Sequence, residues 1–293
     1  MPELPEVETI AKELNEALPG QKIKKTEVFR ANAIEPTQSL LLGKKQGSQN
    51  PQEKTQPDLP RAFAEMITGR RFGAVTRRGK YLLFELVPDL YLVGHLRMTG
   101  KFIVSPPPQQ RPPHHRVWFG LEDGLVLAFQ DMRCFGKLAL VEKPETYAPL
   151  SQLGMEPLDR SFTPTWLNQA LSKSQTPLKH WLMNQHNLAG LGNIYVAEIL
   201  HRAGLSPLRP ANELTAPDIK KLHKQIKSVL REAIQHNGTT ISDFRRVDDK
   251  TGAFQNFLRV YGKAGTDCPK CKGTVTRIRQ QQRSTYYCPD CQT

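Results

Sequence analysis

The feature that most constrains this 293-residue chain is a set of four cysteines close to its end, spaced Cys268-x2-Cys271-x16-Cys288-x2-Cys291. Two Cys-x2-Cys pairs at such a spacing are typical of a tetrahedral zinc site. Disulfides are the alternative, but they are typical of secreted proteins, and the first residues do not resemble a signal peptide. The spacing therefore predicts a hairpin closed by one structural Zn²⁺. The fifth cysteine, Cys134, is expected to be a free thiol.

The charge of the chain favours a polyanionic partner. Lys and Arg number 41 against 28 Asp and Glu, which gives a formal net charge of +13 and a pI of about 9.6. A basic excess of this size is typical of nucleic-acid binding, although many basic proteins bind none. No uncharged apolar run approaches the ~20 residues that span a bilayer. The N-terminus is acidic and lacks a basic-then-apolar signal peptide. We therefore expect an intracellular protein that does not act at a membrane and whose partner is a polyanion.

The first residues, Met-Pro-Glu-Leu-Pro-Glu-Val-Glu, contain a candidate nucleophile. Removal of Met1 before a small residue would leave Pro2 with a secondary amine, and an α-amino group titrates near ~8. Such an amine can attack a carbonyl-like carbon and form an iminium intermediate. Glu3 and Glu6 lie beside it, at the start of a predicted amphipathic helix. The simpler interpretation is a capped helix whose glutamates only interact with the helix dipole.

The hydrophobic pattern predicts an α+β protein. Short apolar runs separated by turn residues indicate antiparallel strands, arranged as a sandwich or barrel with the first helix packed on it. Beyond a boundary at residues 143–149, the period becomes helical. Residues 43–58 contain no apolar side chain other than proline and are expected to form a surface insertion. The predicted strands are 22–29, 81–86, 91–96, 117–119, 125–129 and 137–141, and the predicted helices are 165–171, 178–183, 194–203 and 218–235.

Eight sequence marks, in order, resemble those of the formamidopyrimidine-DNA glycosylase (Fpg) family over essentially the whole chain outside the insertion. The last mark is the four cysteines, and the first, at the N-terminus, is highly specific. The other marks lie in strands, turns and helices along the chain. The seven segments are PELPEVET at 2–9, RRGKYLL at 77–83, HLRMTG at 95–100, DMRCFG at 131–136, LAGLGNIYVAE at 188–198, GTTISDF at 238–244 and VYGKAG at 260–265.

The resemblance implies a fold in three parts. Residues 1–143 would form an N-terminal antiparallel β-sandwich with flanking helices, which carries the catalytic residues. Residues 144–262 would form a helix–two-turn–helix DNA-binding domain, and residues 263–293 a β-hairpin zinc finger. Nothing in the sequence calls for more than a monomer.

The resemblance also implies a bifunctional enzyme that excises oxidised purines, 8-oxoguanine and formamidopyrimidines, from double-stranded DNA and then cuts the strand. Pro2 would attack C1′ of the damaged nucleotide, displace the base and form a Schiff base, and β- and δ-elimination would follow. Glu3 would be the acid/base group at the sugar ring oxygen, and Glu6 a supporting carboxylate.

Three further residues match family positions that contact the DNA backbone. Lys80 would contact phosphate and assist β-elimination, although it could equally be a solvated lysine at a strand start. Arg283 would hold the phosphates that flank the lesion and take part in δ-elimination. Asn193 would bind backbone phosphate, and it could also cap a helix.

Flipping a base out of a duplex leaves a void. Met98, Arg133 and Phe135 match the family's inserted triad, an apolar wedge, a hydrogen-bonding group and a stacking ring. Periodicity alone would instead place Met98 and Phe135 in the core, whereas the neighbouring glycines favour loop tips. His114 matches a DNA-contacting position, as Arg133 does, but the family's His-Asp-His is His-His-Arg here. The segment 238–253 matches the loop that closes over the everted base.

Two alternative functions remain at this stage. A sister glycosylase specific for oxidised pyrimidines shares the zinc and helical modules, but its N-terminus resembles Met-Pro-Glu-Gly, whereas this chain has Leu4. The other alternative is a zinc-containing DNA-binding protein that has lost its chemistry. Every matched catalytic position is intact, which disfavours it.

Overall fold

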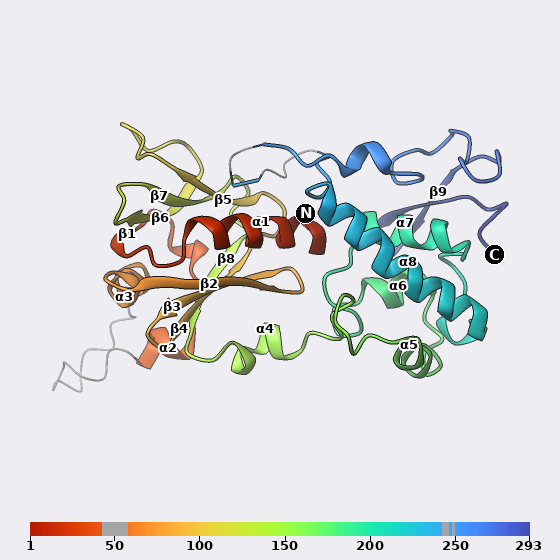
Figure 1. The fold of residues 1–293 in the computed structure, drawn as a ribbon, viewed down its shortest axis with the longest axis horizontal. Helices are drawn as coiled ribbons and strands as arrows, with labels where there is room; N and C mark the ends of the chain where they lie inside the picture. Colours follow the sequence, from red (N-terminus) through yellow and green to blue (C-terminus); the bar gives the residue numbers. More distant parts are fainter. Residues whose placement is uncertain (43–57, 242–245, 248–249) are drawn as a thin grey trace. The chain divides into compact units, whose positions relative to one another are not determined.

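The computed structural model describes residues 1–42, 58–241, 246–247 and 250–293 (Figure 1). The predicted insertion at 43–58 lies outside the described residues except for Asp58. The chain forms two compact units. The first contains Met1–Pro2, Glu6–Ser151 and Thr240–Gly252, and the second contains Glu3–Pro5, Gln152–Thr239 and Ala253–Thr293. The three-domain division, with boundaries after residues 143 and 262, stays a prediction.

Two four-stranded antiparallel sheets form the first unit. One sheet has the order β2-β3-β4-β8 and the other has the order β1-β6-β7-β5. Neighbouring strands pair antiparallel throughout, as the short hairpin connections predict. The strands are β1 Ile23–Val28, β2 Arg71–Arg78, β3 Tyr81–Val87, β4 Leu90–His95, β5 Gly100–Ser105, β6 His115–Leu121, β7 Val126–Asp131 and β8 Lys137–Val141.

The inner faces of these two sheets pack against each other through aromatic side chains. Phe84 of β3 and Phe102 of β5 have ring centroids 5.0 Å apart, and Phe72 of β2 lies 6.4 Å from Phe119 of β6. All four rings are buried in one core that both sheets share. The predicted sandwich is therefore confirmed, and burial of such rings stabilises it through a large loss of apolar surface.

The helix α1, Leu4–Ala17, adds its apolar face to the same core. Val7, Ile10 and Leu14 are buried, as their helical spacing predicts. Asn15 also accepts a hydrogen bond of 2.7 Å from the backbone N–H of Val75 in β2. The remaining helical segments of this unit are η1 Ala31–Ala33, α2 Gln38–Leu42, α3 Leu59–Ile67, η2 Pro144–Thr146 and α4 Ala148–Ser151.

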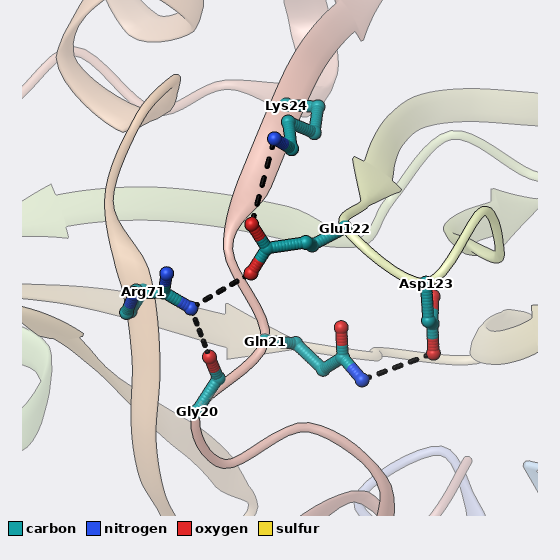
Figure 2. A network of polar contacts seen from close by, with 6 residues as sticks. All are labelled: Gly20, Gln21, Lys24, Arg71, Glu122 and Asp123. Atoms are coloured by element: carbon teal, nitrogen blue, oxygen red, sulfur yellow. Dashed lines mark hydrogen bonds and ion pairs between the residues drawn. The ribbon is translucent and has the colours of Figure 1, made fainter.

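An exposed polar network connects the β6–β7 turn with the starts of β1 and β2 (Figure 2). Glu122 pairs with Arg71 at 2.9 Å and with Lys24 at 3.5 Å, and Gln21 donates to Asp123 at 3.0 Å. The hydrogen bond from Arg71 lowers the pKa of Glu122, and Lys24 adds to the effect. Because these side chains are largely solvated, the network contributes little to stability.

Helices form most of the second unit. The 20-residue α8 buries Ile219, Leu222, Ile226 and Val229, and a capping box of Thr215 and Asp218 begins it. The predicted helices are confirmed to within about two residues at each end. The elements are α5 Pro164–Leu171, α6 Leu178–Met183, α7 Asn193–Ala203, η3 Ala211–Glu213, α8 Ala216–Gln235, η4 Phe254–Phe257, β9 Thr276–Gln280 and β10 Arg283–Tyr287.

The C-terminal hairpin pairs β9 with β10 across a two-residue turn. Gln281 and Gln282 both have positive φ, 43° and 61°, as such hairpin turns require. A small core of Val260, Val275 and two cysteines supports the hairpin. The predicted zinc hairpin is therefore present as a β-hairpin. Among the described residues, no helix has both the length and the apolar character needed to traverse a bilayer.

Candidate active site and nucleic-acid interface

The N-terminal residues are held by a helix that starts 190 positions further along the chain. The Glu3 carboxylate accepts hydrogen bonds from the backbone N–H groups of Ile194 at 3.0 Å and Tyr195 at 3.3 Å. These donors belong to the first turn of α7, whose N-cap residue, Gly192, has no side chain to satisfy them. Glu3 thus acts as the cap of α7, and the helix dipole favours its negative charge.

Two glycines allow the chain to approach this closely. A Cβ on Gly192 would lie 2.4 Å from Cδ of Glu3. Gly190 has φ +88°, and a Cβ there would lie 2.7 Å from Cβ of Leu4. The backbone N–H of Leu4 also donates to the carbonyl of Gly190 at 3.0 Å. The Gly-Leu-Gly-Asn segment is therefore shaped to receive Glu3 and Leu4, because any larger residue would displace them.

Pro2 and Glu6 belong to the first unit. Pro2 is buried, Met1 before it is 47% exposed, and Glu6 in the first turn of α1 is 2% exposed. The carboxylates of Glu3 and Glu6 are thus both removed from solvent, which is unusual for glutamate and points to a specific role. The simpler interpretation, a capped helix whose glutamates only interact with the helix dipole, does not by itself account for their burial.

Arg283 lies in the second unit, beside groups that hold its strand in place. It is the exposed first residue of β10. The carbonyl of the next residue, Ser284, accepts from Asn193 Nδ2 at 3.0 Å and from Lys179 Nζ at 3.0 Å. Lys179 also donates to Thr285 Oγ1 at 2.6 Å. Side chains of α6 and α7 thus fix the backbone next to Arg283.

Burial and two neighbouring charges change the pKa of Lys179. The Lys179 side chain is 1% exposed, and burial lowers its pKa to about 8. The positive charge of Arg283 lowers this pKa further, whereas the negative charge of Glu3 opposes the shift. Glu3, Asn193 and Arg283, which the sequence predicted as site residues, therefore lie within one neighbourhood around Lys179.

Another buried carboxylate, that of Glu198, holds the segment that leads to the zinc hairpin. Glu198 of α7 is fully buried and accepts from the backbone N–H groups of Arg259 at 2.8 Å, Val260 at 3.0 Å and Tyr261 at 2.9 Å. Burial raises the pKa of Tyr261, whose hydroxyl interacts with Asn193. Glu198 thus fixes the backbone at the start of the segment VYGKAG, residues 260–265.

The four cysteines fit a tetrahedral zinc ion. Their sulfur atoms all lie within 4.8 Å of one another, with 3.8 Å between Cys268 and Cys291 and 3.4 Å between Cys271 and Cys288. Sulfurs at ~2.3 Å from one Zn²⁺ would be separated by roughly 3.8 Å. The cluster is therefore consistent with the predicted structural Zn²⁺. Cys134, the fifth cysteine, is a free, partly buried thiol as expected.

Lys80 lies in the first unit at a tight turn between β2 and β3. Arg78 pairs with Tyr81 across the turn, and Gly79 has φ +57°. Lys80 is only 6% exposed, so it is not the solvated strand-start lysine that the alternative describes. Its charge helps to lower the pKa of His95 to about 3, after burial and Arg97, which places these groups close together.

The three residues of the predicted void-filling triad come together at two loop tips. Arg133 Nη1 lies 3.0 Å from Met98 Sδ, and its guanidinium lies 4.8 Å above the ring of Phe135. Met98 is 41% exposed and Phe135 is 49% exposed, so neither is a core residue. Asp131 is buried and binds the backbone N–H groups of Arg133 at 3.1 Å and Gly136 at 2.6 Å. This carboxylate shapes the loop that presents the triad.

His114 adjoins the same loop. It is exposed with φ +69°, and its carbonyl accepts from the N–H of Asp131 at 2.9 Å. His115 points inward, where it contacts Trp118 and Gln130, and burial lowers its pKa to about 4. Of the two adjacent histidines, His114 is therefore the one available to a ligand.

The predicted loop over the everted base is described only in part, because residues 242–245 and 248–249 lie outside the described residues. At its start, Thr239 shares a 2.9 Å hydrogen bond with the buried Tyr195 hydroxyl. At its end, the N–H of Gly252 donates to Thr240 at 2.9 Å. Both ends of the segment are thus held by side-chain hydrogen bonds.

Family models match three consecutive parts of the chain. The formamidopyrimidine-DNA glycosylase N-terminal domain matches residues 1–138, the formamidopyrimidine-DNA glycosylase H2TH domain matches 153–245, and the zinc finger found in FPG and IleRS matches 267–293. Curated formamidopyrimidine-DNA glycosylases match over their full length. The protein of Azorhizobium caulinodans is 40% identical over all of both chains, and that of Pelotomaculum thermopropionicum is 38% identical over 100% of this chain and 99% of its own. The chain belongs to the formamidopyrimidine-DNA glycosylase family.

Solved structures of the family agree with this assignment. The Lactococcus lactis Fpg in complex with a Fapy-dG-containing DNA has a TM-score of 0.85 at 32% identity, covering 99% of this chain and 100% of that one. The same protein with an abasic-site-containing DNA has a TM-score of 0.85, at 32% identity and 99% coverage of both chains. MutM (FPG) from Thermus thermophilus has a TM-score of 0.83 at 36% identity, over 99% of this chain and 98% of that one.

The family assignment confirms the enzyme class, the fold class and the zinc finger that the sequence predicted. The roles of single site residues stay predictions. Within the described residues, those of the first unit are Pro2, Glu6, Lys80, Met98, His114, Arg133 and Phe135, and those of the second unit are Glu3, Asn193, Arg283 and the four cysteines. Sequence reasoning missed Asp131 and Lys179, which hold the backbone beside Arg133 and Arg283, and Glu198, which holds the backbone at 259–261. A buried charge that binds backbone leaves no local pattern in a sequence.

Proposed function

We propose that this chain is a bifunctional DNA glycosylase and AP lyase that excises oxidised purines, 8-oxoguanine and formamidopyrimidines, from double-stranded DNA. The observation that carries the proposal is the binding of the Glu3 carboxylate to the first turn of α7. Because Glu3 directly follows Pro2, this anchor restrains the residue whose nitrogen would act as nucleophile. A restrained nucleophile loses less entropy on the way to the transition state.

The reaction begins with the Pro2 nitrogen once Met1 has been removed. The nitrogen lone pair forms a bond to C1′, the glycosidic bond breaks, and its electron pair leaves with the base, which takes up a proton. The amine proton passes to a general base. The C1′–O4′ bond then breaks, its electron pair stays on O4′, which takes up a proton, and the nitrogen lone pair forms the C=N bond of an iminium ion. With Met1 retained, Pro2 would be an amide nitrogen and could not attack.

The two elimination steps then cut the strand on both sides of the sugar. Loss of a C2′ proton breaks the C3′–O bond, and a second elimination breaks the C5′–O bond. Glu3, the residue next to Pro2, serves as the acid/base group at the sugar ring oxygen. Glu6 supports the same centre, Lys80 assists β-elimination, and Arg283 holds the flanking phosphates for δ-elimination.

His114, Arg133 and Asn193 bind the DNA. His114 and Arg133 are exposed, and Asn193 donates to the carbonyl of Ser284, next to the exposed Arg283. Met98, Arg133 and Phe135 fill the void that the flipped base leaves. We further infer a monomeric, intracellular protein organised as domains 1–143, 144–262 and 263–293, a division supported by where the three family models match.

Replacing Pro2 tests the mechanism. Pro2→Gly should reduce base excision and borohydride trapping on an 8-oxoguanine duplex by at least about a hundredfold, because the secondary amine is lost, while DNA affinity changes little. Pro5→Gly is the matched control and should still be trapped. Intact mass must show that Met1 is absent from each sample.

Four outcomes would count against the proposal. A protein that keeps Met1 and still cleaves damaged DNA would rule out the terminal amine, and an equal loss of binding in Pro2→Gly would remove the case for a nucleophile. Preference for an oxidised cytosine duplex would instead favour the sister glycosylase, and absence of any trapped complex with the Met1-free protein would favour a non-catalytic binding module.

A further inference from the structure

A buried histidine of α7 contacts one of the four zinc-binding cysteines. His201 of α7 is fully buried, and its Nε2 lies 3.3 Å from Sγ of Cys268. Its other ring nitrogen, Nδ1, is buried without a hydrogen-bond partner among the described residues. Cys268 is itself fully buried, so solvent water does not reach its sulfur.

These contacts determine which ring nitrogen carries a proton. A proton on Nε2 points at the sulfur and forms an N–H···S hydrogen bond. A ring protonated only at Nδ1 would bury a donor without an acceptor and would direct the Nε2 lone pair at a thiolate, and both effects are unfavourable. The contact therefore requires an N–H group at Nε2.

The charge of a zinc–cysteine cluster explains why such a donor matters. Four thiolates and one Zn²⁺ carry a net charge of −2, which hydrogen bonds to sulfur disperse. The exposed Cys271 can obtain donors from water, whereas Cys268 depends on the protein. Its sulfur is reached by the N–H of Lys270 at 3.4 Å and by His201.

We propose that His201 is a positioning residue for the zinc site, whose Nε2–H group donates to the Cys268 thiolate, holds zinc more tightly and fastens the zinc hairpin to α7. Glu198, one turn earlier on the same helix, already binds the backbone at 259–261 that leads into the hairpin. With His201, α7 holds both this connecting segment and the first zinc ligand. The proposal concerns the metal site and stands whether or not Pro2 is the nucleophile.

Zinc release from the full-length holoprotein tests the proposal. His201→Phe keeps an aromatic ring but removes the hydrogen-bond donor. This variant should lose zinc to a chromogenic chelator about ten- to a hundredfold faster than the wild type, because loss of a hydrogen-bond partner of a metal ligand weakens metal binding by about this factor. His201→Gln restores an N–H group near Nε2 and should recover most of the retention. His223→Phe is the matched control, since His223 bonds the Phe162 carbonyl at 2.8 Å and should release zinc at the wild-type rate.

Release at the wild-type rate from His201→Phe, or equal rates for the Phe and Gln variants, would overturn the proposal. A measurement on the wild-type sequence covers the case in which the variants fold poorly. In the ¹⁵N-histidine spectrum, His201 should carry its proton on Nε2, and in the ¹¹³Cd-substituted protein this proton should couple to the metal through Cys268. A proton found only on Nδ1 would exclude the hydrogen bond.

Discussion

At the scale of single residues, His95 shows how the fold places an uncharged ring beside cationic groups. Its Nδ1 accepts from the backbone N–H of Arg97 at 3.0 Å, and its ring meets Tyr81 edge-on at 4.5 Å. Burial, followed by the charges of Arg97 and Lys80, lowers the pKa of His95 to about 3. The ring is therefore neutral at physiological pH, and it adds no repulsion next to Lys80.

This neutral ring predicts a loss of stability in acid. The unfolded chain takes up a proton at His95 near pH 6.5, whereas the folded chain does so only near pH 3, so the free energy of unfolding falls as pH decreases through this window. Between pH 6.5 and 4 the loss is at most about 3 kcal/mol. His95→Gln should therefore show a shallower decline in urea unfolding from pH 7 to 4.5. Protonation of the zinc-binding thiolates in acid destabilises both proteins equally and therefore cancels in the comparison. Parallel declines in the two proteins would contradict the prediction.

Some single residues could be predicted from the sequence because the cause is local. Gly100 and Gly136 indicated loop tips, and Met98 and Phe135 are indeed exposed there. Other contacts could not be predicted, since they join distant positions. The sequence offers no sign that Glu3 caps a helix 190 residues away.

At the scale of elements, α7 is a single helix that binds three other parts of its unit. Its first turn holds Glu3, Glu198 in its middle holds the backbone at 259–261, and His201 near its end reaches Cys268. The hydrophobic period predicted the extent of this helix. It did not predict that polar residues of the helix are buried, because periodicity assigns polar residues to the solvated face.

Removing the Glu198 charge should loosen the segment that leads to the zinc hairpin. In Glu198→Gln, the amide nitrogen faces backbone N–H groups that now lack an acceptor, so we expect a loss of about 2–4 kcal/mol in unfolding free energy. Hydrogen exchange at the amides of residues 259–261 should accelerate more than elsewhere. Glu213→Gln, at an exposed glutamate, is the control and should change neither quantity. Unchanged protection at 259–261 would show that the carboxylate does not hold this backbone.

The two sheet strands that the sequence did not reveal, β2 and β5, carry few buried residues. Each has only two, whereas β3 has three and β8, which is also an edge strand, has four. With so few buried positions, the apolar alternation that indicates a strand is weak. The helix α3 was also missed, although Asp58 caps it and Pro60 lies in its first turn, because these signals adjoin a long polar segment.

At the scale of the whole molecule, charge governs the encounter with DNA. The formal charge of +13 becomes +11 when four thiolates and one Zn²⁺ are included. Composition predicted a polyanionic partner but could not locate the binding surface, because net charge contains no information about where the charges lie. The structure offers the exposed Arg283 as a candidate phosphate contact, because Lys179 and Asn193 both donate to the carbonyl of the next residue, Ser284, and so fix its backbone.

Salt dependence of DNA binding can distinguish a localised clamp from a general attraction. Each phosphate that a cation neutralises adds about 0.9 to the magnitude of the slope of log affinity against log salt, so Arg283→Ala should lower this magnitude by about one and weaken binding to damaged and undamaged duplexes alike. Arg71→Ala is the matched control, since it removes the same charge from the network around Glu122 (Figure 2) and should leave the slope unchanged. Equal reductions in both variants would mean that net charge acts as a whole, and an unchanged slope in Arg283→Ala would remove this arginine from the DNA interface.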